Sequence, residues 1–317
     1  MNKLTGMLVL TMAALAPMLA EAQDLPKVSI GMSGWTGFAP LSLAEKSGIF
    51  KKNGVDVTIK MIPQKDRHLA IASGDVQCAA TTVETYINWN ANGVPITQVV
   101  QLDKSYGADG MAARSNIAKI ADLKGKTVGV DAPGTSSYFA LGWMLKKNGL
   151  TMKDVKLTTL SPLAAAAAFN AGTDIDAAMT YEPYLSSVRD NKTAGKIIAT
   201  TLDYPMVMDT FGCTPKFIRE NPKLVQSMVD SYFQAVDMIK AEPAKANEIM
   251  GSVVKQTGEA FGKSSSYLRW QDKEANKKFF NGEIQGFMKE SGELLVELGL
   301  VKTLPDLGTL VDTSFIK

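Results

Sequence analysis

Acidic and aromatic side chains gather at four places where a short apolar run of the sequence ends. These places are residues 33–39, 82–85, 131–137 and 181–184. In open α/β sheets, ligands bind beyond the carboxyl ends of strands, so we expect these loop ends to form a binding site. With Asp209, which follows a later run, they supply the candidate ligand-binding residues Trp35, Thr82, Glu84, Asp131, Thr135, Ser136, Ser137, Tyr181, Glu182 and Asp209.

The charge of this set favours a nitrogen-rich ligand. An unpaired carboxylate in a closing cleft costs several kcal/mol, and an aromatic face attracts a cation. An oxyanion such as nitrate or a sulfonate calls for positive charge, and Arg67, expected in a solvated loop, is the candidate cation. We therefore expect an amine, a guanidinium-like group, an amino-pyrimidine or a zwitterion.

Some of these residues also have simpler interpretations. Trp35 is equally compatible with a core position, Ser136 with a helix N-cap, and Glu182 with an acid that opens a helix. These interpretations stay open at the level of the sequence.

The elements that position these residues follow an α/β pattern. Apolar β runs at residues 28–32 and 55–61 flank a predicted helix near 40–53. Runs at 127–130 and 155–160 flank another at 136–147. Strands that alternate with amphipathic helices are typical of mostly parallel sheets.

Two stretches of the sequence each recur about a hundred residues later, which predicts two similar lobes. Lys51-Lys52-Asn53-Gly54 recurs as Lys146-Lys147-Asn148-Gly149, and residues 74–81 are echoed by 173–180. The first pair reads as helix ends, with cations at the negative end of the dipole and a glycine at the turn. After residue 213 the chain reads as helices at 222–240, 243–256, 273–290 and 292–300, expected to cover the first lobe.

Composition limits the classes of function. The chain has 317 residues, with 34 basic and 32 acidic, and this balance argues against a nucleic-acid partner. Two cysteines and one histidine leave few metal ligands or Cys/His nucleophiles, so no metal site is expected. Residues 1–22 read as a signal peptide, with Lys3, an apolar run and Ala20-Glu21-Ala22.

Several motifs resemble one known family. Residues 35–44, 48–57, 72–76 and 122–130, with Asp176-Ala177-Ala178 and Glu182-Pro183, are similar to periplasmic binding proteins for nitrate, taurine, aliphatic sulfonates and thiamine-pyrimidine precursors. The resemblance runs from about residue 28 to 221.

The resemblance implies the type II periplasmic-binding-protein fold, with two α/β lobes, two crossover strands and a ligand cleft between the lobes. Residues 23–106 with 205–317 would form the first lobe, and 107–204 the second. It further implies a periplasmic, monomeric, non-enzymatic protein without a cofactor. Its partners would be a small solute and the permease and ATPase of an ABC importer at the inner membrane.

Two other classes share the same family pattern. One is an enzyme that builds the thiamine pyrimidine, which needs a placed histidine and a cysteine-rich loop; this chain offers His68 and no cysteine cluster. The other is a ligand sensor for a signalling receptor. In the clamp topology the strands of Cys78 and Cys213 are neighbours, so a disulfide is possible, although buried free thiols are the favoured interpretation.

Overall fold

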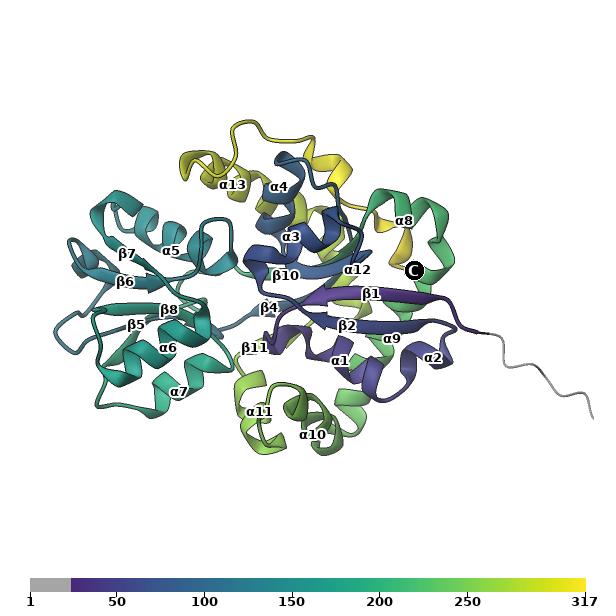
Figure 1. Ribbon diagram of the computed structural model, residues 1–317, viewed down its shortest axis with the longest axis horizontal. Helices are drawn as coiled ribbons and strands as arrows, with labels where there is room; N and C mark the ends of the chain where they lie inside the picture. Colours follow the sequence, from purple (N-terminus) through teal and green to yellow (C-terminus); the bar gives the residue numbers. More distant parts are fainter. Residues whose placement is uncertain (1–23) are drawn as a thin grey trace, which may run out of the picture.

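The computed structural model describes residues 24–317, and the predicted signal peptide lies outside this range. Two sheets with flanking helices lie side by side (Figure 1). The first sheet, in the order β11-β4-β10-β3-β1-β2, consists of β1 (Lys27–Met32), β2 (Asp56–Met61), β3 (Cys78–Thr82), β4 (Thr97–Ser105), β10 (Met208–Cys213) and β11 (Leu268–Trp270). β1 is parallel to β2 and β3, whereas β10 is antiparallel to β3 and β4.

The second sheet is built from the central part of the chain. In the order β7-β6-β8-β5-β9, it consists of β5 (Asp109–Ala113), β6 (Thr127–Val130), β7 (Lys156–Thr159), β8 (Ala177–Tyr181) and β9 (Lys196–Thr200). The parts around the two sheets are called the first and second lobe below. The chain passes between them from β4 to β5 and returns from β9 to β10. The predicted two-lobed α/β fold with two crossings is confirmed.

The helices cover both sheets. Those of the first lobe are α1 (Ala39–Lys46), α2 (Ile49–Lys52), α3 (Gln64–Ala72), α4 (Val83–Ala91), α8 (Pro215–Glu220), α9 (Pro222–Ala241), α10 (Pro243–Val253), α11 (Gly258–Ser265), α12 (Lys273–Lys278) and α13 (Ile284–Glu297). Those of the second are α5 (Ser136–Lys147), α6 (Pro162–Ala171) and α7 (Tyr184–Asp190). Short 3-10 turns are η1 (Thr36–Phe38), η2 (Ile120–Leu123), η3 (Met152–Asp154), η5 (Leu307–Leu310) and η6 (Thr313–Phe315), and η4 (Phe279–Glu283) is a π-turn. None of the helices in residues 24–317 has the length and hydrophobicity needed to cross a bilayer.

The repeated helix ends form as the sequence predicts. α2 and α5 each end in two lysines, and Gly54 (φ 82°) and Gly149 (φ 72°) follow in the left-handed region that favours glycine. The helix predicted near 40–53 is not continuous, because Gly48 with φ 70° divides it into α1 and α2.

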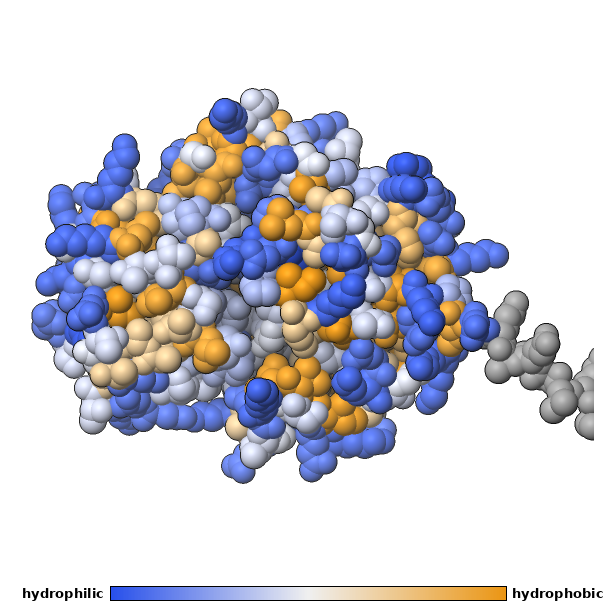
Figure 2. Space-filling model, viewed as in Figure 1, coloured by the Kyte–Doolittle hydropathy of each residue, from blue (hydrophilic) through white to orange (hydrophobic). Residues whose placement is uncertain are grey.

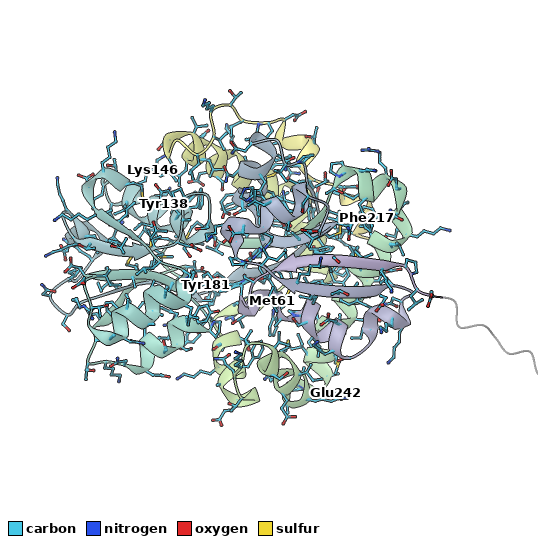
Figure 3. All side chains as sticks on the ribbon, viewed as in Figure 1. Met61, Tyr138, Lys146, Tyr181, Phe217 and Glu242 are labelled. Atoms are coloured by element: carbon cyan, nitrogen blue, oxygen red, sulfur yellow. A yellow bond between two sulfur atoms is a disulfide. The ribbon has the colours of Figure 1, made fainter. Side chains whose placement is uncertain are left out.

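The helical tail differs from the prediction in several respects. The helix predicted over 243–256 ends at Val253, and α11 and β11 were not predicted. The predicted break between residues 290 and 292 is wrong: α13 continues through Gly292, and the irregular turn lies at η4, where Gly282 has φ 120°. The tail also reaches beyond the first lobe. Phe287 of α13 packs on Trp143 of α5 with ring centroids 6.4 Å apart, and Lys146 (labelled in Figure 3) pairs with Glu297 at 2.6 Å.

Cys78 and Cys213 form a disulfide, so the favoured interpretation as free thiols is wrong. The two residues are direct partners in the β3–β10 pairing, and both are fully buried. The cause is strand order: β10 returns to the first sheet beside β3, which brings together residues 135 apart in the sequence.

Replacing both cysteines, Cys78→Ser with Cys213→Ser, is expected to lower the free energy of unfolding by about 2 to 4 kcal/mol, because the crosslink restricts the unfolded chain. Urea denaturation of the variant and the wild type measures this difference. Reduction of the denatured wild type should add the mass of two hydrogens, and an unchanged mass would show that the bond is absent.

Candidate ligand-binding site

A small cavity lies where the two lobes meet, close to Tyr181, which is labelled in Figure 3. Its volume is about 20 Å³, enough for about one water molecule. Both lobes contribute to its lining, which comprises Ser33, Trp35, Phe38, Gln64, Arg67, Thr81, Thr82, Asp109, Ser136, Tyr181, Val207 and Asp209. Five of the predicted binding residues are among them: Trp35, Thr82, Ser136, Tyr181 and Asp209.

Trp35 and Tyr181 form an aromatic wall from opposite lobes. Their rings meet edge to face at 5.3 Å, and the indole Nε1 of Trp35 donates to Asp103 Oδ1 at 3.3 Å. Gly37 permits this arrangement, since a Cβ there would lie 2.1 Å from Asp103 Oδ2 and 2.2 Å from the indole nitrogen. Asp103 of β4 therefore fixes the Trp35 half of the wall, and Tyr181 belongs to β8 of the second lobe.

Two carboxylates reach the cavity from different lobes. Asp209 lies on β10 and Asp109 at the start of β5, and each is 2% exposed. The Oδ2 atom of each has no hydrogen-bond partner among the described residues. Burial raises the pKa of Asp109 to about 7, and burial together with the facing carboxyl of Asp103 raises the pKa of Asp209 well above its usual range. Both carboxyl groups thus line the cavity without an N–H or hydroxyl donor to their buried Oδ2 atoms, and Asp209 can share a proton with the neighbouring carboxyl of Asp103.

Asp103 and Glu84 extend this acidic group behind the lining. Asp103 is the register partner of Asp209 across β4 and β10, and its Oδ2 also lacks a partner among the described residues. Glu84 accepts hydrogen bonds from the hydroxyls of Thr82 and Thr85, and burial raises its pKa to about 7. Glu84 does not line the cavity, so it can act on a ligand only indirectly, through its hydrogen bond with the lining residue Thr82.

Arg67 supplies positive charge at the same place, against expectation. The prediction of a solvated loop residue is wrong: Arg67 lies in α3 and is 1% exposed. It donates to the carbonyl oxygens of Ala80 and, at 3.0 Å, Ile62, while Nε has no partner among the described residues. Gly31 makes room for it, since a Cβ there would lie 3.2 Å from Arg67 Cγ. Burial lowers the pKa of Arg67 to about 10, which leaves it charged at neutral pH.

Gln64 connects the lobes across the cavity. Its Oε1 accepts from the Ser136 amide at 3.2 Å and from the Ser136 hydroxyl at 3.0 Å, at the start of α5. Its Nε2 donates to the hydroxyls of Thr81 at 3.0 Å and Thr85 at 2.9 Å. Both ends of this one carboxamide are therefore engaged, one in each lobe.

The other predicted residues do not line the cavity. Asp131 accepts from its neighbouring Ala132 amide at 2.8 Å, Thr135 caps α5, and Ser137 is buried in the first turn of α5. Glu182 is fully buried, pairs with Arg189 at 3.3 Å and accepts from the Ser186 amide at 3.1 Å. Its contacts are those of an acid at a helix start, which was one of its two interpretations.

Few nucleophilic or metal-binding side chains lie near the site. Both cysteines are joined to each other, and His68 does not line the cavity. Within residues 24–317 there is no cluster of three or more His, Cys, Asp or Glu suited to a metal ion. What the site offers is an aromatic wall, free carboxylate oxygens and a set of hydroxyl and amide donors.

Sequence reasoning missed Asp109 and Gln64 and misplaced Arg67. Asp103 lies on β4, before the first crossing between the lobes, and Asp109 lies on β5, after it. No local sequence pattern shows which side chains of these strands face the cavity. Gln64 did carry a signal, because Pro63 precedes it and the helix α3 begins there, beyond the carboxyl end of β2.

Comparison with known proteins agrees with the two-lobed fold. A Brucella abortus protein named as a binding protein is 24% identical over 301 residues, which covers 90% of each chain. The periplasmic aliphatic sulphonate binding protein SsuA of Escherichia coli has the same fold, with a TM-score of 0.76 and 18% identity over 92% of this chain and 93% of that one. The desulfurization enzyme DSZB also shares it, at a TM-score of 0.66 and 15% identity over 92% of this chain and 97% of that one.

The family follows from the sequence match. The NMT1/THI5-like family matches residues 35–246, which include the aromatic wall, both cavity carboxylates, Arg67 and Gln64. The resemblance inferred from the motifs is thereby confirmed, and this chain belongs to the NMT1/THI5-like family.

Proposed function

We propose that this chain is an exported solute-binding protein that captures a small organic molecule between its lobes and delivers it to an ABC importer. The protein acts as a monomer in the periplasm, where a permease with its ATPase at the inner membrane receives the solute. Three findings support the proposal: the family, a relative named as a binding protein, and a fold shared with a periplasmic binding protein. The face of the molecule in Figure 2 mixes hydrophilic residues with separate apolar patches.

The solute in this proposal is nitrogen-rich and either cationic or zwitterionic. The observation that carries it is that two acids, Asp109 and Asp209, line one cavity with Trp35 and Tyr181, and that their Oδ2 atoms have no N–H or hydroxyl donor among the described residues. Donor groups of an amine, guanidinium or amino-pyrimidine would satisfy these acceptors, and the aromatic wall favours positive charge.

An oxyanion is the second candidate, and Arg67 favours it. The guanidinium lies in the same lining as the Ser136 and Gln64 donors, and a sulphonate-binding protein has the same fold. However, burial raises the pKa values of Asp109 and Asp209, so an anion would bind beside their protonated forms, whereas a cation would bind with release of their protons. Arg67 is better explained as the counter-charge of this acidic group, and as the partner of an acceptor in a zwitterion.

An enzymatic role has less support in the site. The thiamine-pyrimidine enzyme chemistry needs a placed histidine and a cysteine-rich loop, whereas here both cysteines are bonded to each other and His68 lines only the neighbouring outer pocket. We therefore propose binding without catalysis. A sensor function would use the same site and differ in its partner.

A thermal-shift screen tests the proposed solute class. The panel contains amines, guanidines, amino-pyrimidines, taurine, sulfonates and nitrate at equal ionic strength. A ligand at 100 times its dissociation constant stabilises the folded state by about 2.7 kcal/mol, so a hit is visible as a higher Tm. We expect stabilisation by nitrogen-rich cations or zwitterions. Stabilisation by sulfonates or nitrate alone would reject the proposed class.

A further inference from the structure

A second, larger pocket adjoins the small cavity. It has a volume of about 260 Å³ and lies between the two lobes, where α3 and α4 face the loop before α5. Gln64 lines both spaces. Ligand pockets in proteins usually span several hundred cubic ångströms, which the inner cavity of about 20 Å³ does not approach by itself.

Gln64 is the partition between the two spaces. Its carboxamide crosses from the hydroxyls of Thr81 and Thr85 to the amide and hydroxyl of Ser136. A ligand that carries one acceptor and one donor can take over these hydrogen bonds and so release the Gln64 side chain. Movement of one side chain would join the inner cavity and the outer pocket.

We propose that the outer pocket is a second compartment of the ligand site, which takes an uncharged, hydrogen-bonding part of the solute when Gln64 swings away. This inference rests on the proposed function, in which the cationic part of the same solute occupies the inner cavity. That cavity holds about one water molecule in this structure, so the lobes must also part to admit the head. The solute is thus a two-part molecule, with a nitrogen-rich head and a polar, uncharged tail.

The lining of the outer pocket specifies the chemistry of the tail. Asn88 and Asn92 present amide groups, and Val94, Pro133 and Leu300 present apolar surface. No carboxylate side chain belongs to the lining, and the charge of Lys65 is balanced by Asp66, 2.9 Å away. His68 and Trp89, with ring centroids 6.4 Å apart, complete the lining. The two asparagine amides and the absence of a lining carboxylate favour an uncharged, hydrogen-bonding tail, and the carboxylate probe below tests whether Lys65 or His68 attracts an anionic one.

The position of the opposite wall depends on a glycine. Gly134, in the loop of the second lobe, has φ 88°, and a Cβ there would lie 2.8 Å from Asn88 Nδ2. The loop thus approaches the amide of Asn88 as closely as only glycine allows, which brings amides of the first lobe against the backbone of the second.

A matched series of guanidines tests the second compartment. The probes are methylguanidinium as the head alone, 4-guanidinobutanamide with an uncharged tail, and 4-guanidinobutanoate with a charged tail. Calorimetry on the wild type is expected to show at least tenfold tighter binding of the amide than of methylguanidinium, and a smaller gain for the carboxylate.

Two variants locate the gain. Asn92→Trp introduces a large side chain that fills the outer pocket. It should remove the tenfold gain in affinity of the amide over methylguanidinium and leave the affinity for methylguanidinium itself unchanged. Leu300→Trp should have the same effect from the other side of the pocket. Val296→Trp, on the exposed side of α13, should keep the gain.

The outcomes separate this inference from the proposed function. If methylguanidinium binds but the amide tail adds nothing, or if the gain survives in Asn92→Trp and Leu300→Trp, the second compartment is wrong and the cationic site stands. A carboxylate tail that gains more than the amide overturns the uncharged class. If methylguanidinium itself does not bind, both proposals fail.

Discussion

The double variant Asp109→Asn with Asp209→Asn is expected to weaken binding of the cationic solute by about 100-fold or more. Each of the two acids lines the cavity, and its Oδ2 atom has no N–H or hydroxyl donor among the described residues. Loss of a charged hydrogen bond costs about 1.5 to 3 kcal/mol, which is about tenfold or more for each position. The amide also presents N–H groups to a ligand that is itself rich in donors, so repulsion adds to the loss.

Calorimetry with the strongest compound of the screen measures this effect. Asp174→Asn serves as the control, because Asp174 is an exposed aspartate of the second lobe. Glu84→Gln is expected to have a much smaller effect, since Glu84 lies behind Thr82 and does not line the cavity. Equal losses for Glu84→Gln and for the double variant would place the ligand elsewhere.

Stability of the protein without added ligand is expected to fall as the pH rises from about 5 to 8. The pKa values of Glu84 and Asp109 are raised to about 7 by burial, from ordinary values of 4.5 and 3.8. The folded protein therefore binds protons that the unfolded chain has already released. The stability that each group contributes is complete below its unfolded pKa and is lost as the pH rises through the folded pKa near 7.

The expected loss is about 3 kcal/mol for each group over this range, because one pKa unit corresponds to about 1.36 kcal/mol. Asp103 and Asp209 change in the same direction, since burial raises the pKa of both. This trend is opposite to that of ordinary paired carboxylates, whose stabilisation increases as they ionise.

Urea denaturation at pH 5 and pH 8 measures the effect. Glu84→Gln keeps an oxygen for the Thr82 and Thr85 hydroxyls but cannot titrate, so its stability should depend less on pH than that of the wild type, by about 3 kcal/mol. Asp174→Asn should leave the pH dependence unchanged. Parallel pH profiles for the wild type and Glu84→Gln would show that Glu84 ionises normally.

Much of the fold could be predicted because its signals are local. The Lys-Lys-Asn-Gly helix ends and the two echoed strand entries describe βα units that need no distant contact to be recognised. The break in the tail was misplaced because Gly292 resembles a helix end, although it is a contact site: a Cβ there would lie 3.0 Å from Leu304. A local pattern does not distinguish these two roles of glycine.

The site was predictable only where it lies at strand ends. Trp35, Thr82, Ser136 and Tyr181 follow apolar runs, and the rule of ligands beyond carboxyl ends was enough to select them. The pairing of Asp103 with Asp209 depends on strand order, and the burial of Arg67 depends on the space that Gly31 leaves. Both are features of the tertiary structure that a local pattern does not reveal. The disulfide depends on the same return of β10 to the first sheet.

The central claim is that buried carboxylates take the charge of the solute, and proton counting during binding tests it most directly. Calorimetry of the strongest compound of the screen, at pH 6.5 in two buffers of different ionisation enthalpy, gives the number of protons exchanged. A cation should displace protons held by the buried acids, so we expect proton release, smaller in Asp109→Asn than in the wild type. Proton uptake, as an oxyanion beside these acids would cause, would contradict the account.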